Sequence, residues 1–130
     1  MNNNINTDNM LRVGTVLHGT YCIGRYLSSG GFGNTYVAMN IQFGEQYAIK
    51  EFFMRGISQR DNNNTTVSVS NTDNRETFAS QLEKFKKEAR RLRKLNNEHI
   101  VRVHDLFEEN GTAYYVMDYM EGKSLEEQLP

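Results

Sequence analysis

Several features that mark whole classes of protein are missing from this sequence of 130 residues. Cys22 is its one cysteine, so no disulfide can form within the chain, and this usage fits a reducing, cytoplasmic setting. Neither charge predominates, with 15 basic and 16 acidic residues, which argues against a general attraction to nucleic acid or membranes. A secretion-type leader and an apolar run long enough to span a bilayer are also missing. The length suits one domain with a core of its own.

Composition divides the chain into a leader, a domain and an insertion. Residues 1–9 are polar and rich in asparagine, so we expect a disordered leader that buries nothing. Residues 10–130 are expected to form the domain, because strand-forming residues begin at about Leu11. Residues 54–74 are polar again, which predicts a surface loop or insertion with room for a short edge strand.

Apolar periodicity predicts five strands and one main helix. The strands are expected at 20–28, 35–39, 46–53, 100–107 and 113–117. Asp73 and Glu76 resemble a capping box at the start of the helix. Its apolar stripe is formed by Phe78, Leu82, Phe85, Ala89, Leu92 and Leu95. A further helix is expected to begin near Ser124. This order predicts an α+β domain, in which one helix packs on an antiparallel sheet.

A glycine-rich turn, residues 27–36, lies between the first two predicted strands. It contains Gly30, Gly31 and Gly33, with Phe32 at its tip. Glycine lets the main chain approach a ligand closely, so the amide N–H groups of such a turn can bind phosphate. An ordinary hairpin is the alternative, and the pattern alone does not exclude it.

Two charged residues interrupt apolar patterns. Lys50 lies within an apolar strand, and Glu88 lies between Phe85 and Leu92 of the helical stripe, where a carboxylate should be largely desolvated. Because an unpaired buried charge is costly, we expect Lys50 and Glu88 to form an ion pair. The alternative is that Glu88 lies in water at the edge of the stripe and that Lys50 extends outward to solvent.

Taken together, these motifs resemble the small N-terminal lobe of protein kinases. The glycine-rich turn, the tripeptide 48–50, the helix with Glu88 and residues 115–122 match four linked motifs of that family, in order. Gly-Gly-Phe-Gly-x-Thr-Tyr and Ile-Lys-Glu-Phe-Phe look most like bacterial serine/threonine kinases of eukaryotic type. The resemblance covers roughly residues 14–129 and implies a five-stranded antiparallel sheet packed with one main helix of the αC type.

The resemblance also implies an ATP site. Lys50 would hold the α- and β-phosphates, and Glu88 would pair with Lys50 in the active arrangement. The other positions implied to contact ATP are Leu27, Ser28, Gly30, Gly31, Phe32, Gly33, Thr35, Ala48, Met117, Asp118 and Met120. Backbone groups of the last two would bond the adenine edge.

Some positions depart from the family pattern or point beyond this chain. Ser28 stands where the family usually has its first glycine, and Thr35 where it usually has a valine. Leu92 and Val103 match apolar positions that stack toward the large lobe. Mg²⁺ is expected only with that large lobe, so no metal site is predicted here.

A string that imitates the kinase catalytic loop lies at residues 104–110. Asp105 and Asn110 have the right separation, but the string precedes Met117, and Asn110-Gly111 is typical of a hairpin turn. We therefore predict strand and turn there. Neither Asp-Phe-Gly nor Ala-Pro-Glu follows. We expect the small lobe of a bacterial serine/threonine kinase, either cut from a longer protein or a natural fragment, and inactive by itself.

Two other functions stay open. A small lobe could be a regulatory, pseudokinase-like module that binds a protein partner. The basic helix segment 84–94 could bind nucleic acid, although Glu83 and Glu88 interrupt it. A solvated face, or a face for a phosphorylated segment of the large lobe, is the simpler interpretation. We expect ATP and a protein substrate as partners, no nucleic acid and no membrane contact, and the oligomeric state is not defined.

Overall fold

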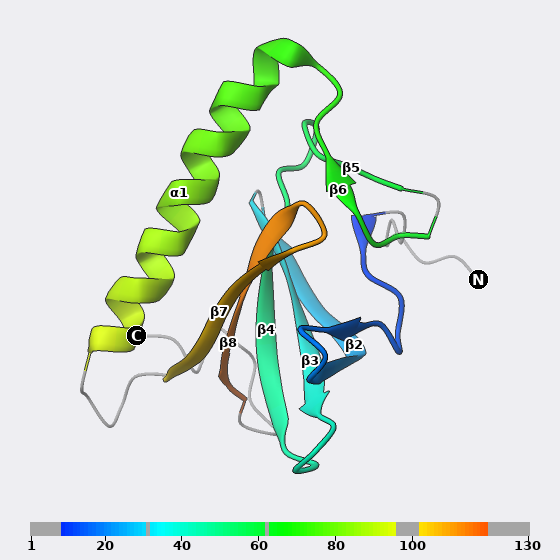
Figure 1. Ribbon diagram of the computed structural model, residues 1–130, viewed down its shortest axis with the longest axis vertical. Coiled ribbons are helices and arrows are strands. Elements are labelled where there is room, and N and C mark those ends of the chain that lie inside the picture. The colour runs from blue at the N-terminus through cyan, green and yellow to red at the C-terminus, as the bar shows by residue number, and fades with distance from the viewer. Residues whose placement is uncertain (1–8, 31, 62, 96–101, 120–130) are drawn as a thin grey trace.

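The fold is a twisted antiparallel sheet with a long helix along one side (Figure 1). The computed structural model describes residues 9–30, 32–61, 63–95 and 102–119. The sheet has the order β1-β2-β3-β4-β8-β7. Its strands are β1 (Val16–Leu17), β2 (Tyr21–Gly30), β3 (Gly33–Asn40), β4 (Gln46–Phe52), β7 (Val103–Glu109) and β8 (Thr112–Asp118). A separate hairpin pairs β5 (Gln59–Arg60) with β6 (Val67–Ser68), and α1 (Thr72–Lys94) contacts β7 and β8.

The predicted α+β class, an antiparallel sheet packed with a helix, is confirmed within the described residues. The two-residue strand β1 at the sheet edge was not predicted. The start of the helix also differs, because the cap is Asn71, whose side-chain oxygen accepts a hydrogen bond from the Asp73 N–H at 2.8 Å. The predicted capping box of Asp73 and Glu76 is therefore wrong. The helix expected near Ser124 lies outside the described residues.

Strand alternation gives the sheet two different cores, because successive side chains of a strand point to opposite faces. The helix-side core packs the sheet against α1 and includes Ala48, Phe52, Phe85, Ala89, Leu92, Val103, Tyr115 and Met117. The rear core lies on the other face and includes Leu11, Leu17, Tyr21, Ile23, Tyr36, Ile49, Phe107, Tyr114 and Val116. Consecutive residues of β4 therefore belong to different environments.

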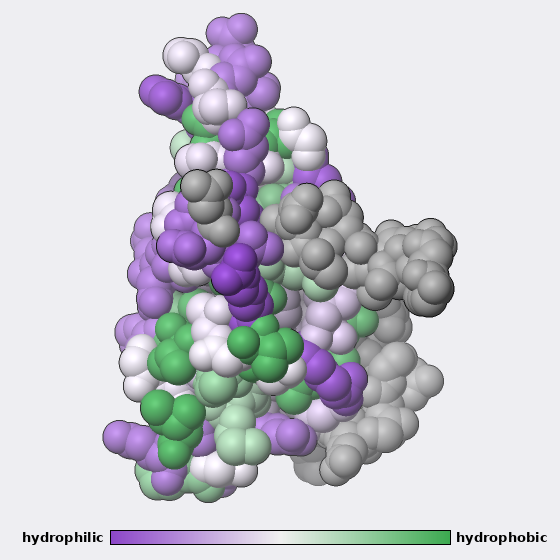
Figure 2. Space-filling model, turned by 90° about the vertical axis from the view of Figure 1, so that its right-hand side faces the viewer, coloured by the Kyte–Doolittle hydropathy of each residue, from purple (hydrophilic) through white to green (hydrophobic). Residues whose placement is uncertain are grey.

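The start of the described chain, from Asn9, and the β5–β6 hairpin lie on the same side of the molecule (Figure 1). On the face that Figure 2 shows, hydrophilic residues cover the upper part and hydrophobic residues gather in the lower half. Asn9, the last residue of the predicted leader, is bonded to the fold, because its carbonyl oxygen accepts hydrogen bonds from Asn34 at 2.9 Å and Arg60 at 3.1 Å. The prediction that residues 1–9 bury nothing is thus wrong for Asn9, and the rest of the leader lies outside the described residues.

Candidate functional site

A pocket of about 430 Å³ opens between the glycine-rich turn, β4 and α1. Seven of the predicted site residues line it, and these are Ser28, Gly30, Phe32, Gly33, Thr35, Lys50 and Glu88. The remaining lining residues are Ser29, Phe52, Gln81, Lys84, Phe85 and Tyr115. The fold therefore brings the glycine-rich turn and both singled-out charges to one cavity.

The glycine-rich turn is held by strand pairing up to its tip. Gly30 ends β2 and Gly33 begins β3, and the two are partners in the β2–β3 ladder. A side chain at Gly33 has no space, because its Cβ would lie 2.9 Å from the Glu51 carbonyl oxygen and 3.4 Å from Lys50 Cε. Gly33 thus allows the turn to pack directly on the strand that carries Lys50. Phe32 at the tip is 52% exposed.

Lys50 projects from the middle of β4 into this pocket. Its ladder partners are Thr35 on β3 and Tyr115 on β8, and all three line the cavity. Lys50 is half-buried and forms no ion pair with any residue that the structure describes. Its ammonium group is available to an anionic ligand.

Glu88 does not form the expected ion pair with Lys50. Its side chain is 51% exposed and accepts a hydrogen bond from Arg91 at 3.1 Å. The alternative interpretation, that Glu88 lies at the edge of the apolar stripe, is the one that the structure shows. At 3.6 residues per turn, Glu88 lies roughly 80° from the centre of the stripe. Glu88 still lines the pocket. Burial of Tyr115, together with the negative charge of Glu88, raises the pKa of Tyr115 to about 12.

Of the residues implied to contact the adenine, Thr35 lines this pocket, whereas Ala48, Met117 and Asp118 do not. Ala48 and Met117 are ladder partners that lie buried in the helix-side core, and Leu27 is half-buried on β2. The Asp118 N–H already donates to the Arg102 carbonyl at 3.0 Å. Gly31 and Met120 lie outside the described residues.

The string that imitates a catalytic loop is a strand and a turn, as predicted. Asp105 lies in β7 and accepts hydrogen bonds from the Tyr21 hydroxyl at 3.0 Å and the Leu106 N–H at 2.9 Å. Burial and the hydrogen bond to Asp105 raise the pKa of Tyr21 to about 12. Asn110 and Gly111 have φ values of 57° and 78°, as a type I′ hairpin requires.

Leu92 and Val103, the apolar positions implied to stack toward the large lobe, are both buried in the helix-side core.

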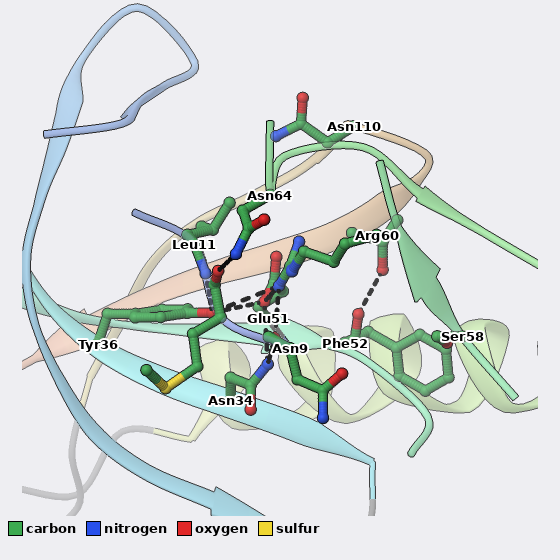
Figure 3. Close-up of polar contacts among 12 residues, drawn as sticks. Asn9, Leu11, Asn34, Tyr36, Glu51, Phe52, Ser58, Arg60, Asn64 and Asn110 are labelled. Carbon is green, nitrogen blue, oxygen red and sulfur yellow. Dashed lines mark hydrogen bonds and ion pairs between the residues drawn. The ribbon is translucent and has the colours of Figure 1, made fainter. Parts of the chain in front are cut away.

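The sequence interpretation missed a buried carboxylate directly after Lys50. Glu51 has no exposed surface and accepts hydrogen bonds from Tyr36 at 2.8 Å, Tyr114 at 2.9 Å and Asn34 at 3.2 Å. It also forms an ion pair with Arg60, and Figure 3 shows Asn34, Tyr36 and Arg60 converging on it. Strand alternation held the signal, since two consecutive charges in a buried strand must face opposite sides.

Two features are missing from the described residues, a metal-type cluster of side chains and a membrane-spanning helix. No three side chains of His, Cys, Asp or Glu cluster as a metal site would require, in the portion of the chain that the structure describes. Across the same portion, no helix combines the length and the apolar character that crossing a membrane needs. The pocket offers an ammonium group beside a closely packed glycine-rich turn, a combination that suits phosphate.

Comparisons with known proteins agree on one family. The family model described as "Protein kinase domain" matches residues 21–130. Serine/threonine-protein kinase PrkC of Bacillus subtilis is 30% identical over 117 residues, covering 90% of this chain and 15% of PrkC. CBL-interacting protein kinase 30 of Oryza sativa subsp. japonica is 26% identical over 110 residues, covering 85% of this chain and 19% of that protein. The chain thus spans less than a fifth of the length of these relatives.

The fold comparison gives a similar result. The solved structure described as PpkA-294 in its apo form matches with a TM-score of 0.83 and 29% identity, covering 91% of this chain and 41% of that one. The crystal structure of the Mycobacterium tuberculosis PknI kinase domain matches with a TM-score of 0.57 and 22% identity, covering 85% of this chain and 36% of that one. The second likeness shows the fold alone.

Proposed function

Since the chain belongs to the protein kinase family, we propose that it is the ATP-binding small lobe of a serine/threonine protein kinase. In its full-length form this kinase transfers the γ-phosphate of ATP to serine or threonine hydroxyls of a protein substrate. One observation carries the proposal. Lys50, which has no ion-pair partner among the described residues, lies in a pocket beneath the glycine-rich turn.

The residues present fit the phosphates of ATP. Lys50 would bind the α- and β-phosphates, and main-chain N–H groups between Gly30 and Gly33 would bind phosphate oxygens. The close packing of Gly33 on β4 supports this assignment, because a Cβ would fill the space where turn and strand meet. Phe32 would cover the phosphates from the tip of the turn, and Thr35 would contact the adenine.

Phosphoryl transfer needs groups beyond this cradle, because Mg²⁺ and the acceptor hydroxyl must be positioned by further polar residues. The sequence contains no Asp-Phe-Gly motif. The 130-residue chain alone is therefore inactive, and in the full-length kinase the large lobe supplies these groups. The half-buried free thiol of Cys22 is consistent with a cytoplasmic location.

Substitution of Lys50 tests the proposal. In the full-length protein, Lys50→Met lowers phosphate transfer at least about a hundredfold, because one preorganised charge-stabilising group is lost. Lys87→Met removes the same charge from the exposed surface of α1 and leaves transfer unchanged. Transfer is measured with radiolabelled ATP and a generic protein substrate. Equal activity of Lys50→Met and wild type would refute the assignment of Lys50, and labelling by the 130-residue chain alone would refute its inactivity.

The nucleic-acid alternative is weakened by contacts of the basic helix. Lys86 is bonded to Glu83 at 2.8 Å and Glu108 at 3.0 Å, and Arg93 donates to the carbonyl oxygens of Val103 and His104, both at 3.0 Å. Lys86 and Arg93 are therefore already bonded within the protein. A gel shift with random duplex DNA separates the two functions, since tight, salt-dependent binding would favour nucleic acid.

A protein-binding module without catalysis is the remaining alternative. It predicts that the full-length wild-type protein transfers no phosphate, whether or not it holds a nucleotide weakly. The same labelling experiment, together with calorimetric titration of Mg-ATP, decides between that module and an active kinase.

A further inference from the structure

The polar insertion, residues 54–74, packs against the sheet. The Val67 N–H donates to the Asn110 carbonyl at 2.7 Å, and Val67 is 4% exposed. At Gly111, a Cβ would lie 2.3 Å from the Val67 carbonyl oxygen, so the hairpin touches the β7–β8 turn directly. Figure 1 places the β5–β6 hairpin and the glycine-rich turn at the same end of the sheet.

Arg60 lies in the insertion and extends its side chain into the protein interior. Its side chain is 2% exposed and forms an ion pair with Glu51. The same guanidinium donates to the carbonyl oxygens of Thr65 at 3.0 Å and Asn9 at 3.1 Å, and it lies 4.9 Å from the centre of the Phe53 ring. Burial lowers the pKa of Arg60, but the charge of Glu51 and its hydrogen bond outweigh that effect and raise it overall. Arg60 thus remains a cation inside the fold.

The carboxylate that Arg60 meets is adjacent to the ATP pocket. Asn34 and Glu51 are partners in the β3–β4 ladder, and the next partners along it are Thr35 and Lys50, which line the pocket. Asn34 also donates its side-chain N–H to Glu51 at 3.2 Å (Figure 3). One ladder step therefore separates the buried ion pair from the lysine implied to hold phosphate.

The insertion also reaches the glycine-rich turn without passing through Glu51. The exposed Arg55 donates its Nε–H to the Gly30 carbonyl at 3.2 Å. Just before the insertion, the Phe53 N–H donates to the Phe32 carbonyl at 3.1 Å, and Arg60 stacks on the Phe53 ring. Both sides of the turn are thus bonded to the segment that contains or adjoins the insertion.

We propose that the insertion is a positioning element for the phosphate-binding turn, with Arg60 acting through Glu51 on β3 and β4 and Arg55 acting directly on Gly30. This inference rests on the proposed function, because it takes the turn to be the ATP phosphate site. Arg55 and Arg60 are positioning residues, since neither lines the pocket.

Stability alone is a poor explanation of this arrangement. Replacing a buried ion pair by apolar residues of similar size is often neutral or stabilising, so a core built only for stability would not need Glu51 and Arg60. A planar guanidinium does impose a defined orientation on the groups that it bonds. Here Arg60 is paired with Glu51 on β4, and Glu51 accepts hydrogen bonds from Asn34 and Tyr36 on β3, the strand that begins at the turn.

Substitution of Arg55 is the first test, because Arg55 is exposed and its loss should not unfold the chain. In the full-length protein, Arg55→Ala raises the KM for Mg-ATP about threefold to tenfold, as expected for one lost hydrogen bond, with kcat little changed. Hydrogen–deuterium exchange accelerates in peptides covering residues 27–36. The matched control is Arg12→Ala, which removes an exposed arginine whose side chain bonds to no described residue and changes neither quantity.

Graded substitution of Arg60 is the second test. Arg60→Gln removes the charge, whereas Arg60→Lys retains the charge and loses the planar guanidinium group. Both are measured well below their unfolding temperatures, where circular dichroism confirms that they are folded. We expect exchange at residues 27–36 and the KM for Mg-ATP to rise in the order wild type, Arg60→Lys, Arg60→Gln. A purely structural role would lower the unfolding temperature and leave exchange at the turn and KM unchanged.

The outcomes distinguish this inference from the proposed function. If wild-type protein neither binds Mg-ATP nor transfers phosphate, the proposed function fails, whereas exchange at residues 27–36 still reports whether the insertion orders the turn. Unchanged exchange in folded Arg55→Ala and Arg60→Gln overturns the positioning role, whatever the activity. Should Arg60→Gln fail to fold, Arg55→Ala alone decides.

Discussion

Two consecutive residues of β4, Lys50 and Glu51, have opposite environments. Lys50 is half-buried, faces the pocket on the helix side and has no ion-pair partner in the parts of the chain that are described. Glu51 faces the rear core, has no exposed surface and receives hydrogen bonds from two tyrosine hydroxyls, an asparagine and Arg60. One strand thus carries two kinds of charge. On its helix-side face, called the open side, Lys50 is accessible to a ligand, and on its rear face, called the closed side, Glu51 is fully enclosed by the protein.

The difference follows from the cost of desolvation. A fully buried carboxylate must be satisfied within the protein, so strands β3 and β8 and the insertion all supply donors to Glu51. A half-buried ammonium group keeps some hydration and can leave part of its bonding capacity for a ligand. Glu88 belongs to the open side as well, since it is 51% exposed and has one surface partner. The closed side therefore contributes architecture, and the open side contributes binding capacity.

The largest effect is expected where the closed side loses one charge. Arg60→Met leaves Glu51 buried without its cation and lowers the free energy of unfolding by about 3 to 5 kcal/mol. Urea denaturation of the 130-residue chain at pH 7 measures the loss.

The double variant, Glu51→Met with Arg60→Met, serves as the control for that measurement. It removes both charges and should regain most of the lost stability, because no unpaired charge stays buried. If Arg60→Met alone costs less than about 1 kcal/mol, Glu51 is not a closed charge that depends on Arg60.

A second prediction concerns the contact between the insertion and the sheet. Gly111→Ala lowers the free energy of unfolding by about 3 kcal/mol, because a Cβ there meets the Val67 carbonyl at 2.3 Å and the φ of 78° is strained for alanine. Gly44→Ala is a matched control, with a φ of 72° but nothing within 4 Å, and should cost about 1 kcal/mol. Equal losses in the two variants would show that the hairpin does not pack on the β7–β8 turn.

The open side was more accessible to sequence reasoning than the closed side. The spacing of Phe85, Ala89 and Leu92 identified the buried face of α1, and the glycine-rich turn with Lys50 identified the pocket. Spacing of three and four residues does not tell the centre of a stripe from its edge, which is why Glu88 was misplaced. The partner of Glu51 was beyond reach, because Arg60 lies in an insertion with no apolar period and meets Glu51 only through tertiary packing.

Alkaline titration sharpens the comparison on the helix side. Burial and the charge of Glu88 raise the pKa of Tyr115 to about 12, above an ordinary value of about 10. The neutral hydroxyl is favoured in the folded state, so its contribution is complete below pH 10 and is lost as the pH rises toward 12. Tyr115→Phe should reduce the fall in unfolding free energy over this range by about 2 to 3 kcal/mol. Parallel curves for variant and wild type, from thermal melts between pH 7 and 12, would contradict the assignment.

The smallest change in stability is expected at Glu88. Its ion pair with Arg91 joins two side chains that are 51% and 60% exposed, and such surface pairs contribute at most about 0.5 kcal/mol. The free energies of unfolding of Glu88→Gln and Arg91→Gln should therefore both lie within about 0.5 kcal/mol of the wild-type value. A loss above about 1.5 kcal/mol in Glu88→Gln would mean that Glu88 is buried and paired in solution, as the stripe first suggested.

Activity should separate these two variants where stability does not. If Glu88 must leave Arg91 and pair with Lys50 in the active arrangement, Glu88→Gln lowers phosphate transfer by the full-length protein at least about tenfold, since Lys50 loses its orienting partner. Arg91→Gln frees Glu88 and does not lower transfer. On the closed side, by contrast, substitution of Arg60 has its largest effect on the free energy of unfolding. Activity that falls equally in both variants would show that the Glu88–Arg91 pair itself is the functional arrangement.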